Sequence, residues 1–129
     1  MQLDFEKLGG LVPAVVQDFR TGEVLMLGFM NAAALEATLS TGNVTFFSRS
    51  RNKLWVKGER SGHRLRLREL RIDCDADAVL ARVEPLGSGV CHEGFQSCFF
   101  RRLNAEGEGT VIAEKTFDPG QIYGEGKQS

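Results

Sequence analysis

The feature that most constrains this chain is the placement of its three cysteines. Cys91 and Cys98 close a short stretch in which His92 follows the first thiol, and Cys74 stands upstream between two aspartates. Thiolates are ligands that zinc prefers, and three of them leave one tetrahedral position for a water, as in catalytic sites. The alternative is three buried free thiols that pack as small hydrophobic side chains. Their charged and imidazole neighbours favour metal ligation, so we expect a fold that brings these thiols to one metal.

The bulk composition predicts one globular domain over residues 1–129. The chain is 42% hydrophobic and 26% charged, with a net charge of −1, as in ordinary domains of this size. We expect a core over about residues 11–103 and a peripheral tail over 104–129. No apolar run is long enough to span a membrane. The N-terminus is acidic and unlike a signal peptide, so a cytoplasmic location is expected, and the balanced charge does not suggest a nucleic-acid partner.

Apolar patterning predicts mostly strands and one main helix at about residues 31–41. Asn31 has the character of an N-cap and Gly42 that of a residue just past the C-terminus. From residue 63 to 72, arginines alternate with leucines and the parity then slips, which predicts a β-bulge near Arg68-Glu69. In the tail, Val111-Ile112 and Ile122-Tyr123 are candidates to pack against the body. The expected strands cover residues 11–18, 24–30, 44–47, 54–57, 63–72, 79–83 and 97–101.

His92 has two possible roles. Neighbouring residues of an extended strand point to opposite faces, so His92 would face away from a metal on Cys91 unless the backbone turns there. It would then be free for general acid–base work, for which an imidazole is suited. As a fourth ligand it would instead close a structural site with the three cysteines.

The acidic cluster Asp73, Asp75 and Asp77 is a candidate magnesium site. Along an extended strand Asp73 and Asp77 would be about 13 Å apart, too far for one Mg²⁺. A shared metal therefore requires a turn or bridging waters, and a solvated acidic turn is the alternative. The spacing resembles an EF-hand loop, but Ala78 stands where that loop needs glycine, which excludes it.

The middle of the chain is basic and rich in groups that bind phosphate. Guanidinium forks, hydroxyls and backbone N–H groups are the usual partners of a phosphate. A basic stretch near Phe46, Phe47 and Trp55 is also compatible with RNA binding, although no RNP-type motif is present. The candidate phosphate-binding residues are Ser48, Arg49, Ser50, Arg51, Lys57, Ser61 and Gly62.

These residues together resemble the phosphoribosyl-AMP cyclohydrolase family of histidine biosynthesis. The similarity runs from about Leu11 to Arg101, and Arg60 and Glu93 stand where the family often has threonine. The blocks that carry it are Gly22-Glu23-Val24-Leu25-Met26, Met30-Asn31, Ser48-Arg49-Ser50-Arg51, Leu54-Trp55-Val56-Lys57-Gly58-Glu59, Ser61-Gly62-His63, Asp73-Cys74-Asp75-Ala76-Asp77, and Cys91-His92-x-Gly94-x-x-Ser97-Cys98-Phe99.

The resemblance implies an α+β, predominantly β fold with a barrel-like sheet, in an obligate homodimer. It implies one zinc per subunit at the dimer interface, held by Cys74 of one chain and by Cys91 and Cys98 of the other. It also implies Mg²⁺ on Asp73, Asp75 and Asp77. The substrate would be a small phosphoribosyl nucleotide whose adenine ring is opened by hydrolysis at the N1–C6 bond, with His92 moving a proton.

A second hypothesis comes from a different class of protein. A module with structural zinc would grip RNA or a nucleotide through its basic strands, and no chemistry would depend on His92. Its binding would weaken with salt, because phosphate contacts release counterions.

Overall fold

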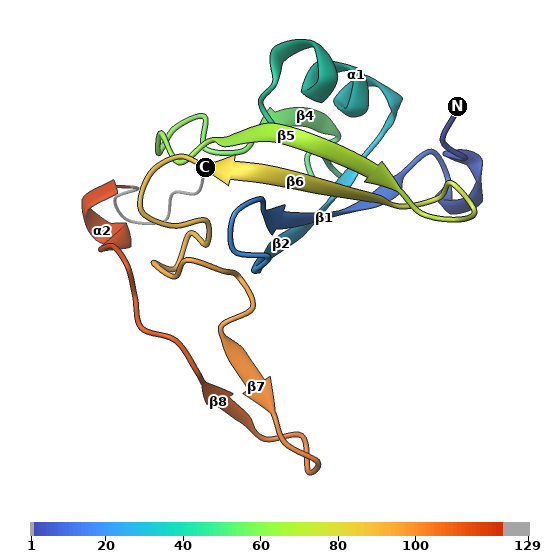
Figure 1. Cartoon of the computed structure of the whole chain (residues 1–129). Coiled ribbons are helices and arrows are strands. Elements are labelled where there is room, and N and C mark those ends of the chain that lie inside the picture. The colour runs from blue at the N-terminus through green and yellow to red at the C-terminus, as the bar shows by residue number, and fades with distance from the viewer. Residues whose placement is uncertain (1, 123–129) are drawn as a thin grey trace.

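A four-stranded sheet forms the centre of the chain, in a computed structural model that describes residues 2–122. Its strands are β1 (Val12–Asp18), β2 (Val24–Met30), β5 (Leu65–Ile72) and β6 (Val79–Pro85), in the order β2-β1-β6-β5 (Figure 1). β1 and β6 run parallel, and the other neighbours are antiparallel. Burial alternates along β1, so one face of the sheet is turned to the core.

The helix α1 (Ala32–Thr41) covers that inner face. The side chain of Asn31 accepts from the backbone N–H of Ala34 over 2.8 Å, and Gly42 adopts a left-handed φ of 77°. Both predicted ends of the helix are thus confirmed. Thr38, fully buried, accepts from the backbone N–H of Thr45 over 2.9 Å and fixes the following strand to the helix.

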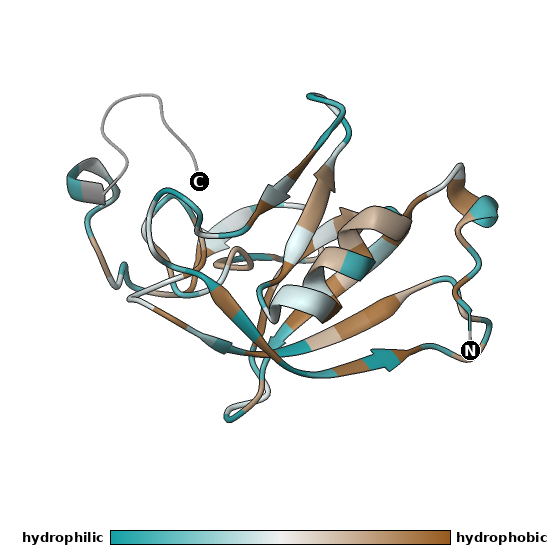
Figure 2. Cartoon of the chain, turned by 90° about the horizontal axis from the view of Figure 1, so that it is seen from above, coloured by the Kyte–Doolittle hydropathy of each residue, from teal (hydrophilic) through white to brown (hydrophobic). Residues whose placement is uncertain are grey.

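The strands β3 (Thr45–Ser48) and β4 (Lys53–Val56) form a separate hairpin beside β2. Phe46 is fully buried and its ring lies 5.1 Å from that of Trp55. Gly28 makes room for it, since a Cβ there would be 2.5 Å from the Phe46 ring. Figure 2 shows apolar and polar residues alternating along the strands near α1, which is the pattern that sets the core.

The expected barrel-like sheet is wrong. The four-stranded sheet is open, with β2 and β5 as its edges. Closure would need a ladder between β5 and the β3–β4 hairpin, but only an isolated bridge joins Asn43 to Arg66. The α+β class with mostly strands and one main helix is confirmed. The bulge is confirmed too, because the β5–β6 register shifts between Leu67 and Glu69.

The expected strand at residues 97–101 is also wrong. Regular pairing starts only at β7 (Arg101–Leu103), which pairs with β8 (Gly109–Val111) in a hairpin that extends away from the body (Figure 1). The hydroxyl of Ser97 accepts from the N–H of Phe99 over 2.9 Å, a local turn in place of a ladder. Short helices complete the described chain, the 3-10 helix η1 (Glu6–Leu8) and α2 (Pro119–Ile122).

The packing predicted for the tail is not seen within the described chain. Val111 and Ile112 remain about half exposed, at 54% and 49%. Of the second pair, Tyr123 lies outside the described residues. In residues 2–122 no helix has the length and apolar character needed to cross a membrane.

Candidate active site

The two downstream thiols lie on one tight loop. The backbone N–H of Cys91 donates to the carbonyl of Phe95, and that of Gly94 donates back to the carbonyl of Cys91, each over 3.0 Å. Gly94 has a φ of 102°, which glycine adopts readily. The loop buries Cys91, which is 3% exposed, and folds the chain back toward Cys98.

An irregularity in β2 anchors this loop to the sheet. Val16 pairs with Met26 and Gln17 with Val24, so Leu25 is an extra residue on β2. Such a bulge leaves carbonyls outside the regular ladder. The carbonyl of Leu25 accepts from the N–H of Cys98, and that of Val24 accepts from the hydroxyl of Ser97, both over 2.7 Å.

The two thiols are electrostatically linked. Partial burial and the neighbouring Cys91 thiol together raise the pKa of the Cys98 thiol to about 12, while the positive charge of Lys57 opposes the shift. Two adjacent thiolates without a cation would repel each other. A bound divalent cation would instead favour the thiolate form of both cysteines, because metal binding to a thiol displaces its proton.

Lys57 is an unusual neighbour for this pair. It is 5% exposed, and none of the ion pairs among residues 2–122 includes it. Its Nζ lies 6.0 Å from the centroid of the Trp55 ring. Lysine is almost never buried without a compensating anion, so this position suits a negatively charged partner from outside the chain, or the thiolates themselves.

His63 is a second buried titratable group at this end of the sheet. It is 6% exposed, and its ring meets the edge of Phe117 at 4.7 Å. Its Nε2 lies 3.4 Å from the hydroxyl of Ser88. Its Nδ1 has no partner of hydrogen-bond geometry within the described chain, although the Gly89 backbone lies close by. Burial lowers its pKa below the ordinary 6.5, and Lys57 adds to the effect.

His92 is exposed on the thiol loop. The predicted extended geometry does not apply, because the chain turns directly after Cys91. An exposed imidazole next to a buried thiol can exchange protons with solvent and with a bound molecule. This position is compatible with the predicted acid–base role.

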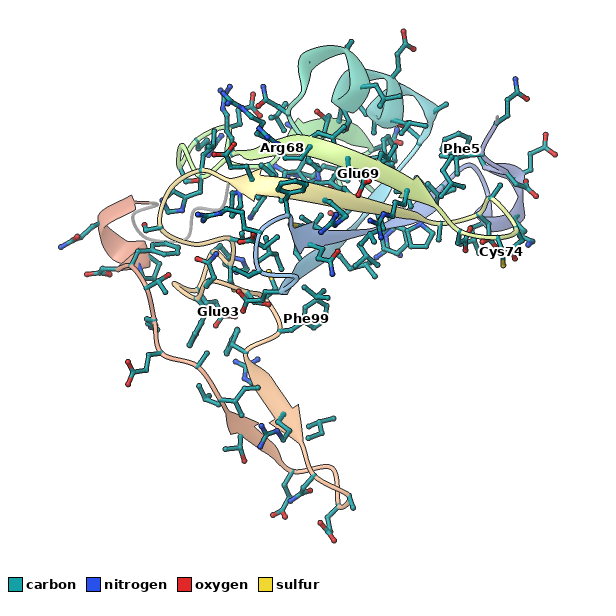
Figure 3. The ribbon with its side chains drawn as sticks, viewed as in Figure 1. Phe5, Arg68, Glu69, Cys74, Glu93 and Phe99 are labelled. Carbon is teal, nitrogen blue, oxygen red and sulfur yellow. The ribbon has the colours of Figure 1, made fainter. Side chains whose placement is uncertain are left out.

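Cys74 lies elsewhere, on the turn between β5 and β6. Figure 3 shows it at one end of the sheet, well apart from Glu93 and Phe99. Cys98 is tied to the edge strand β2, and three strand spacings separate β2 from β5, or about 14 Å. Zinc–sulfur bonds of about 2.3 Å require sulfurs about 4 Å apart. One chain therefore does not assemble the three predicted zinc ligands.

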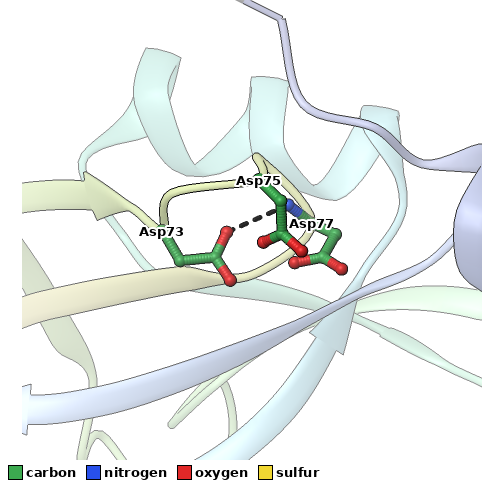
Figure 4. A group of neighbouring side chains, drawn as sticks. All are labelled: Asp73, Asp75 and Asp77. Carbon is green, nitrogen blue, oxygen red and sulfur yellow. Dashed lines mark hydrogen bonds between the residues drawn. The ribbon is translucent and has the colours of Figure 1, made fainter.

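The acidic residues do come together (Figure 4). Asp73 accepts from the backbone N–H groups of Asp77 and Ala78 over 3.0 and 3.2 Å, and Ala76 has a left-handed φ of 60°. Carboxylate oxygens of Asp73, Asp75 and Asp77 lie within 4.8 Å of one another. The turn that a shared metal requires is thus present, and these side chains could hold a cation.

Lys7 contacts this cluster, which the sequence did not indicate. Its Nζ lies 3.0 Å from Asp75 and 3.1 Å from Asp77. Hydrogen bonding to Lys7 holds the pKa of Asp75 at about 2, whereas the neighbouring Asp75 raises the pKa of Asp77. The partners are 68 and 70 positions apart in sequence, so no local pattern could have found them.

The predicted phosphate-binding residues divide into two groups. Arg49 and Ser50 line a hollow of about 510 Å³ with the side chains of aromatic residues, and Arg49 lies 4.1 Å above the ring of Phe29. Ser61 and Gly62 lie on the turn before His63, whose N–H donates to Ser61 over 3.1 Å. The hollow is lined by Gly28, Phe29, Phe46, Phe47, Arg49, Ser50 and Trp55.

The other two members of the basic stretch lie next to this hollow. The hydroxyl of Ser48 accepts from the N–H of Arg51 over 3.2 Å, and it lies 3.4 Å from the Ser50 hydroxyl. These contacts fix the turn between β3 and β4, which carries Arg49 and Arg51. Aromatic walls beside cations suit a base and its phosphate.

Comparison with known proteins supports the resemblance seen in the motifs. A family model described as phosphoribosyl-AMP cyclohydrolase matches residues 26–100. A phosphoribosyl-AMP cyclohydrolase of Solibacter usitatus is 60% identical over 124 residues, covering 96% of this chain and 98% of the relative. Those of Desulforapulum autotrophicum and Nitratidesulfovibrio vulgaris are each 52% identical, covering 95% and 93% of this chain and 98% and 94% of the relatives.

A small, mostly β chain with paired thiols, a buried lysine beside them and these relatives is a hydrolytic enzyme. More narrowly, the chain belongs to the phosphoribosyl-AMP cyclohydrolase family.

Proposed function

We propose that the chain opens the adenine ring of 1-(5-phosphoribosyl)-AMP by zinc-dependent hydrolysis of the N1–C6 bond, a step of histidine biosynthesis. The product would be the formimino-carboxamide ribotide. The observation that carries the proposal is the pairing of Cys91 and Cys98 on a loop anchored to β2, in a chain of this family.

The chemistry of the donors fits zinc. Two adjacent thiols, one with its pKa raised to about 12 by burial and by its neighbour, become stable as thiolates only next to a cation. Bound zinc would supply hydroxide near neutral pH by lowering the pKa of a water. Thiolate ligands also need a reducing compartment, so we place the enzyme in the cytoplasm.

The chain's own residues account for the remaining steps. The ribosyl group on N1 makes C6 electrophilic. As water adds to C6, His92 takes a proton and returns it to N1 when the C6–N1 bond breaks. The aromatic hollow would hold the nucleotide, with Arg49 on a phosphate. Lys57 would face negative charge close to the thiols, since no carboxylate among residues 2–122 lies within ion-pair distance of it.

The third ligand would come from a second subunit. Cys74 is exposed and about the width of the sheet from Cys98, so a homodimer that places Cys74 of one chain near Cys91 and Cys98 of the other completes the set. Each dimer would then hold two zinc ions. Asp73, Asp75 and Asp77 would hold Mg²⁺ next to the same interface, because their oxygens converge on the turn that carries Cys74.

A mixing experiment tests the shared site. Cys74→Ala and Cys98→Ala chains, each inactive alone, are unfolded, mixed in equal amounts and refolded. Half of the dimers are then mixed, and each has one intact site, so zinc content and turnover should reach about a quarter of wild type. Cys91→Ala mixed with Cys98→Ala is the control and should stay inactive, since both changes fall on the same side of the site. Absence of complementation in the test pair, or complementation in the control, would contradict the proposal.

A variant of His92 separates catalysis from a structural-zinc module that binds RNA. His92→Ala should retain zinc and lose turnover by about 10²–10⁴-fold. Full turnover in this variant, or tight salt-dependent RNA binding by a zinc-loaded but inactive wild type, would favour the module.

A further inference from the structure

We propose that residues 115–117, the return segment, are positioning residues that hold the His63 imidazole and the thiol loop in one fixed relation. The return segment lies between β8 and α2, where the chain comes back from the hairpin (Figure 1). Phe117 acts through His63, and Thr116 acts through the loop that follows β6. The inference rests on the proposed function and goes beyond it, because it gives a role in turnover to a part of the tail that was expected to be peripheral.

The return segment is bonded to the thiol loop through the backbone. The carbonyl of Gly94 accepts from the N–H of Thr116 over 2.8 Å and from that of Phe117 over 3.4 Å. The N–H of the same glycine donates to the carbonyl of Cys91 and closes the loop. The tight turn that carries Cys91 and His92 is therefore bonded from its outer side to the tail.

The packing between the return segment and the site leaves no room for a side chain at two glycines. A Cβ on Gly94 would lie 2.8 Å from the carbonyl oxygen of Phe117, and one on Gly89 would lie 2.7 Å from the Phe117 ring. Both distances are below the roughly 3.5–4.0 Å of ordinary contacts between non-bonded atoms. An isolated antiparallel bridge between Phe95 and Lys115 extends the same contact. The return segment is therefore closely fitted to this end of the molecule.

Thr116 attaches the return segment to the loop that follows β6. Its hydroxyl donates to the backbone carbonyl of Ser88, and the hydroxyl of Ser88 lies 3.4 Å from Nε2 of His63. A Cβ on Gly87 would lie 2.3 Å from Cδ2 of the His63 ring, so this loop packs directly on the imidazole. Residues 87–89 thus contact both the return segment and His63.

Phe117 also contacts His63 directly. The two rings meet at 88° with their centroids 4.7 Å apart, an arrangement that aromatic pairs favour. His63 is 6% exposed, and its Nδ1 has no partner of hydrogen-bond geometry within residues 2–122. An imidazole with so few hydrogen bonds depends on packing for its orientation, and Phe117 supplies part of that packing.

The orientation of His63 matters because this imidazole lies near the thiols. The positive charge of Lys57 lowers the pKa of His63 and opposes the rise in the pKa of Cys98, so both groups lie within range of one ammonium group. In a reaction site a misplacement of about 1 Å can cost about a hundredfold in rate. Turnover then depends on where the imidazole lies, and through it on Phe117.

A double-mutant cycle on the full-length, zinc-loaded protein tests whether Phe117 acts through His63. Phe117→Ala should lower kcat by about ten- to a hundredfold and change KM by less than about threefold, because it misplaces a group and removes no contact with substrate. In a His63→Gln background the same change should cost less than about twofold more, since the group that it positions is gone. Phe117→Leu keeps apolar volume against the imidazole and should recover kcat to within about threefold of wild type.

Phe19→Ala is the matched control. It removes a phenyl ring that is 39% exposed and lies 5.4 and 5.2 Å from the guanidinium groups of Arg68 and Arg82. It should leave kcat unchanged in the wild-type and His63→Gln backgrounds. Additive losses from Phe117→Ala and His63→Gln, or wild-type turnover in either variant, would overturn the role of Phe117.

Amide hydrogen exchange of the native protein follows the thiol loop without the use of turnover. Thr116→Val removes the hydroxyl that donates to Ser88 and keeps the shape of the side chain. In Thr116→Val and in Phe117→Ala, the amides of residues 88–95 should exchange at least about fivefold faster than in wild type, while those of β1 remain unchanged. Circular dichroism at the same temperature checks that both variants are folded.

The outcomes separate this inference from the proposed function. Unchanged exchange at residues 88–95 in both variants would overturn the link between the return segment and the thiol loop, even in a protein that holds zinc and turns over substrate. A protein that holds no zinc and has no turnover would refute the proposed function. Faster exchange at residues 88–95 in the variants of that protein would still support the positioning role.

Discussion

The backbone N–H of Cys98 donates to the carbonyl of Leu25 over 2.7 Å, which ties a thiol of the site to the bulge of β2. The bulge thus serves the site as well as the sheet. Leu25 and Met26 are consecutive and both buried. Because Leu25 has no pairing partner on β1, its carbonyl can accept a hydrogen bond from the thiol loop. The thiol loop is held by this irregularity of the backbone and by the side chain of Ser97.

Replacing Ser97 with alanine should loosen the thiol loop. Its hydroxyl donates to the carbonyl of Val24 over 2.7 Å and accepts from the N–H of Phe99 over 2.9 Å. Losing both partners in a buried position costs about 1–3 kcal/mol of unfolding free energy. If the loop holds zinc as proposed, the metal should also dissociate faster, as a chelator competition would show. Ser40→Ala, on the exposed end of α1, is the control, and equal zinc loss in both variants would contradict this role.

Lys7 should compete with Mg²⁺ for the acidic cluster. Its Nζ lies 3.0 Å from Asp75 and 3.1 Å from Asp77, so a divalent cation must displace it. Exposed ion pairs are weak because solvent screens them, so Lys7→Ala should raise Mg²⁺ affinity by only about two- to fivefold, measured by calorimetry. The same change should raise the pKa of Asp75 from about 2 toward its ordinary value. Lys53→Ala, an exposed lysine of β4, should change neither quantity.

The parts that could be predicted from the sequence are those encoded locally. Asn31 and Gly42 mark the ends of α1 because capping depends on a few neighbouring residues. The parity slip after Leu67 predicted the bulge for the same reason. For Asp73, Asp75 and Asp77, the reach of an extended chain showed only that a shared metal would need a turn or bridging waters, and the structure has the turn.

The parts that could not be predicted depend on distant partners. Phe99 and Phe100 favour a strand by their own propensity, but Ser97 and the carbonyl of Leu25 impose a turn. The contact between Lys7 and Asp75 spans 68 positions. Closure of the sheet depends on how far β5 pairs with the segment that leads into the β3–β4 hairpin. That pairing is limited to a single bridge between Asn43 and Arg66, so the sheet stays open.

His63 should make the folded state sensitive to mild acid. Burial lowers its folded pKa below the ordinary 6.5. The unfolded chain therefore binds a proton at a higher pH than the native chain does, so stability is full above about pH 6.5 and falls as the pH drops through that value. The Tm of the wild-type protein should decrease when the pH is lowered from about 7.5 to about 5.5. The Tm of His63→Gln should decrease less over the same pH range. An equal fall in the two proteins would show that His63 is not the group responsible.

Gly58 should be intolerant of any side chain, and the loss should reach the site. Its φ is 81°, and a Cβ there would lie 2.3 Å from the backbone carbon of His63. Left-handed strain and overpacking together predict that Gly58→Ala lowers the unfolding free energy by about 2–5 kcal/mol. Because Lys57 precedes this residue and His63 contacts it, turnover should fall as well, even at temperatures where the variant is folded.

Gly42→Ala is the matched control: its φ is 77° but no atom lies within 4 Å of the new Cβ, so it should cost only about 1 kcal/mol and leave turnover unchanged. Similar losses in the two variants, measured by denaturant unfolding, would mean that backbone strain alone acts at Gly58 and that its packing against His63 does not matter.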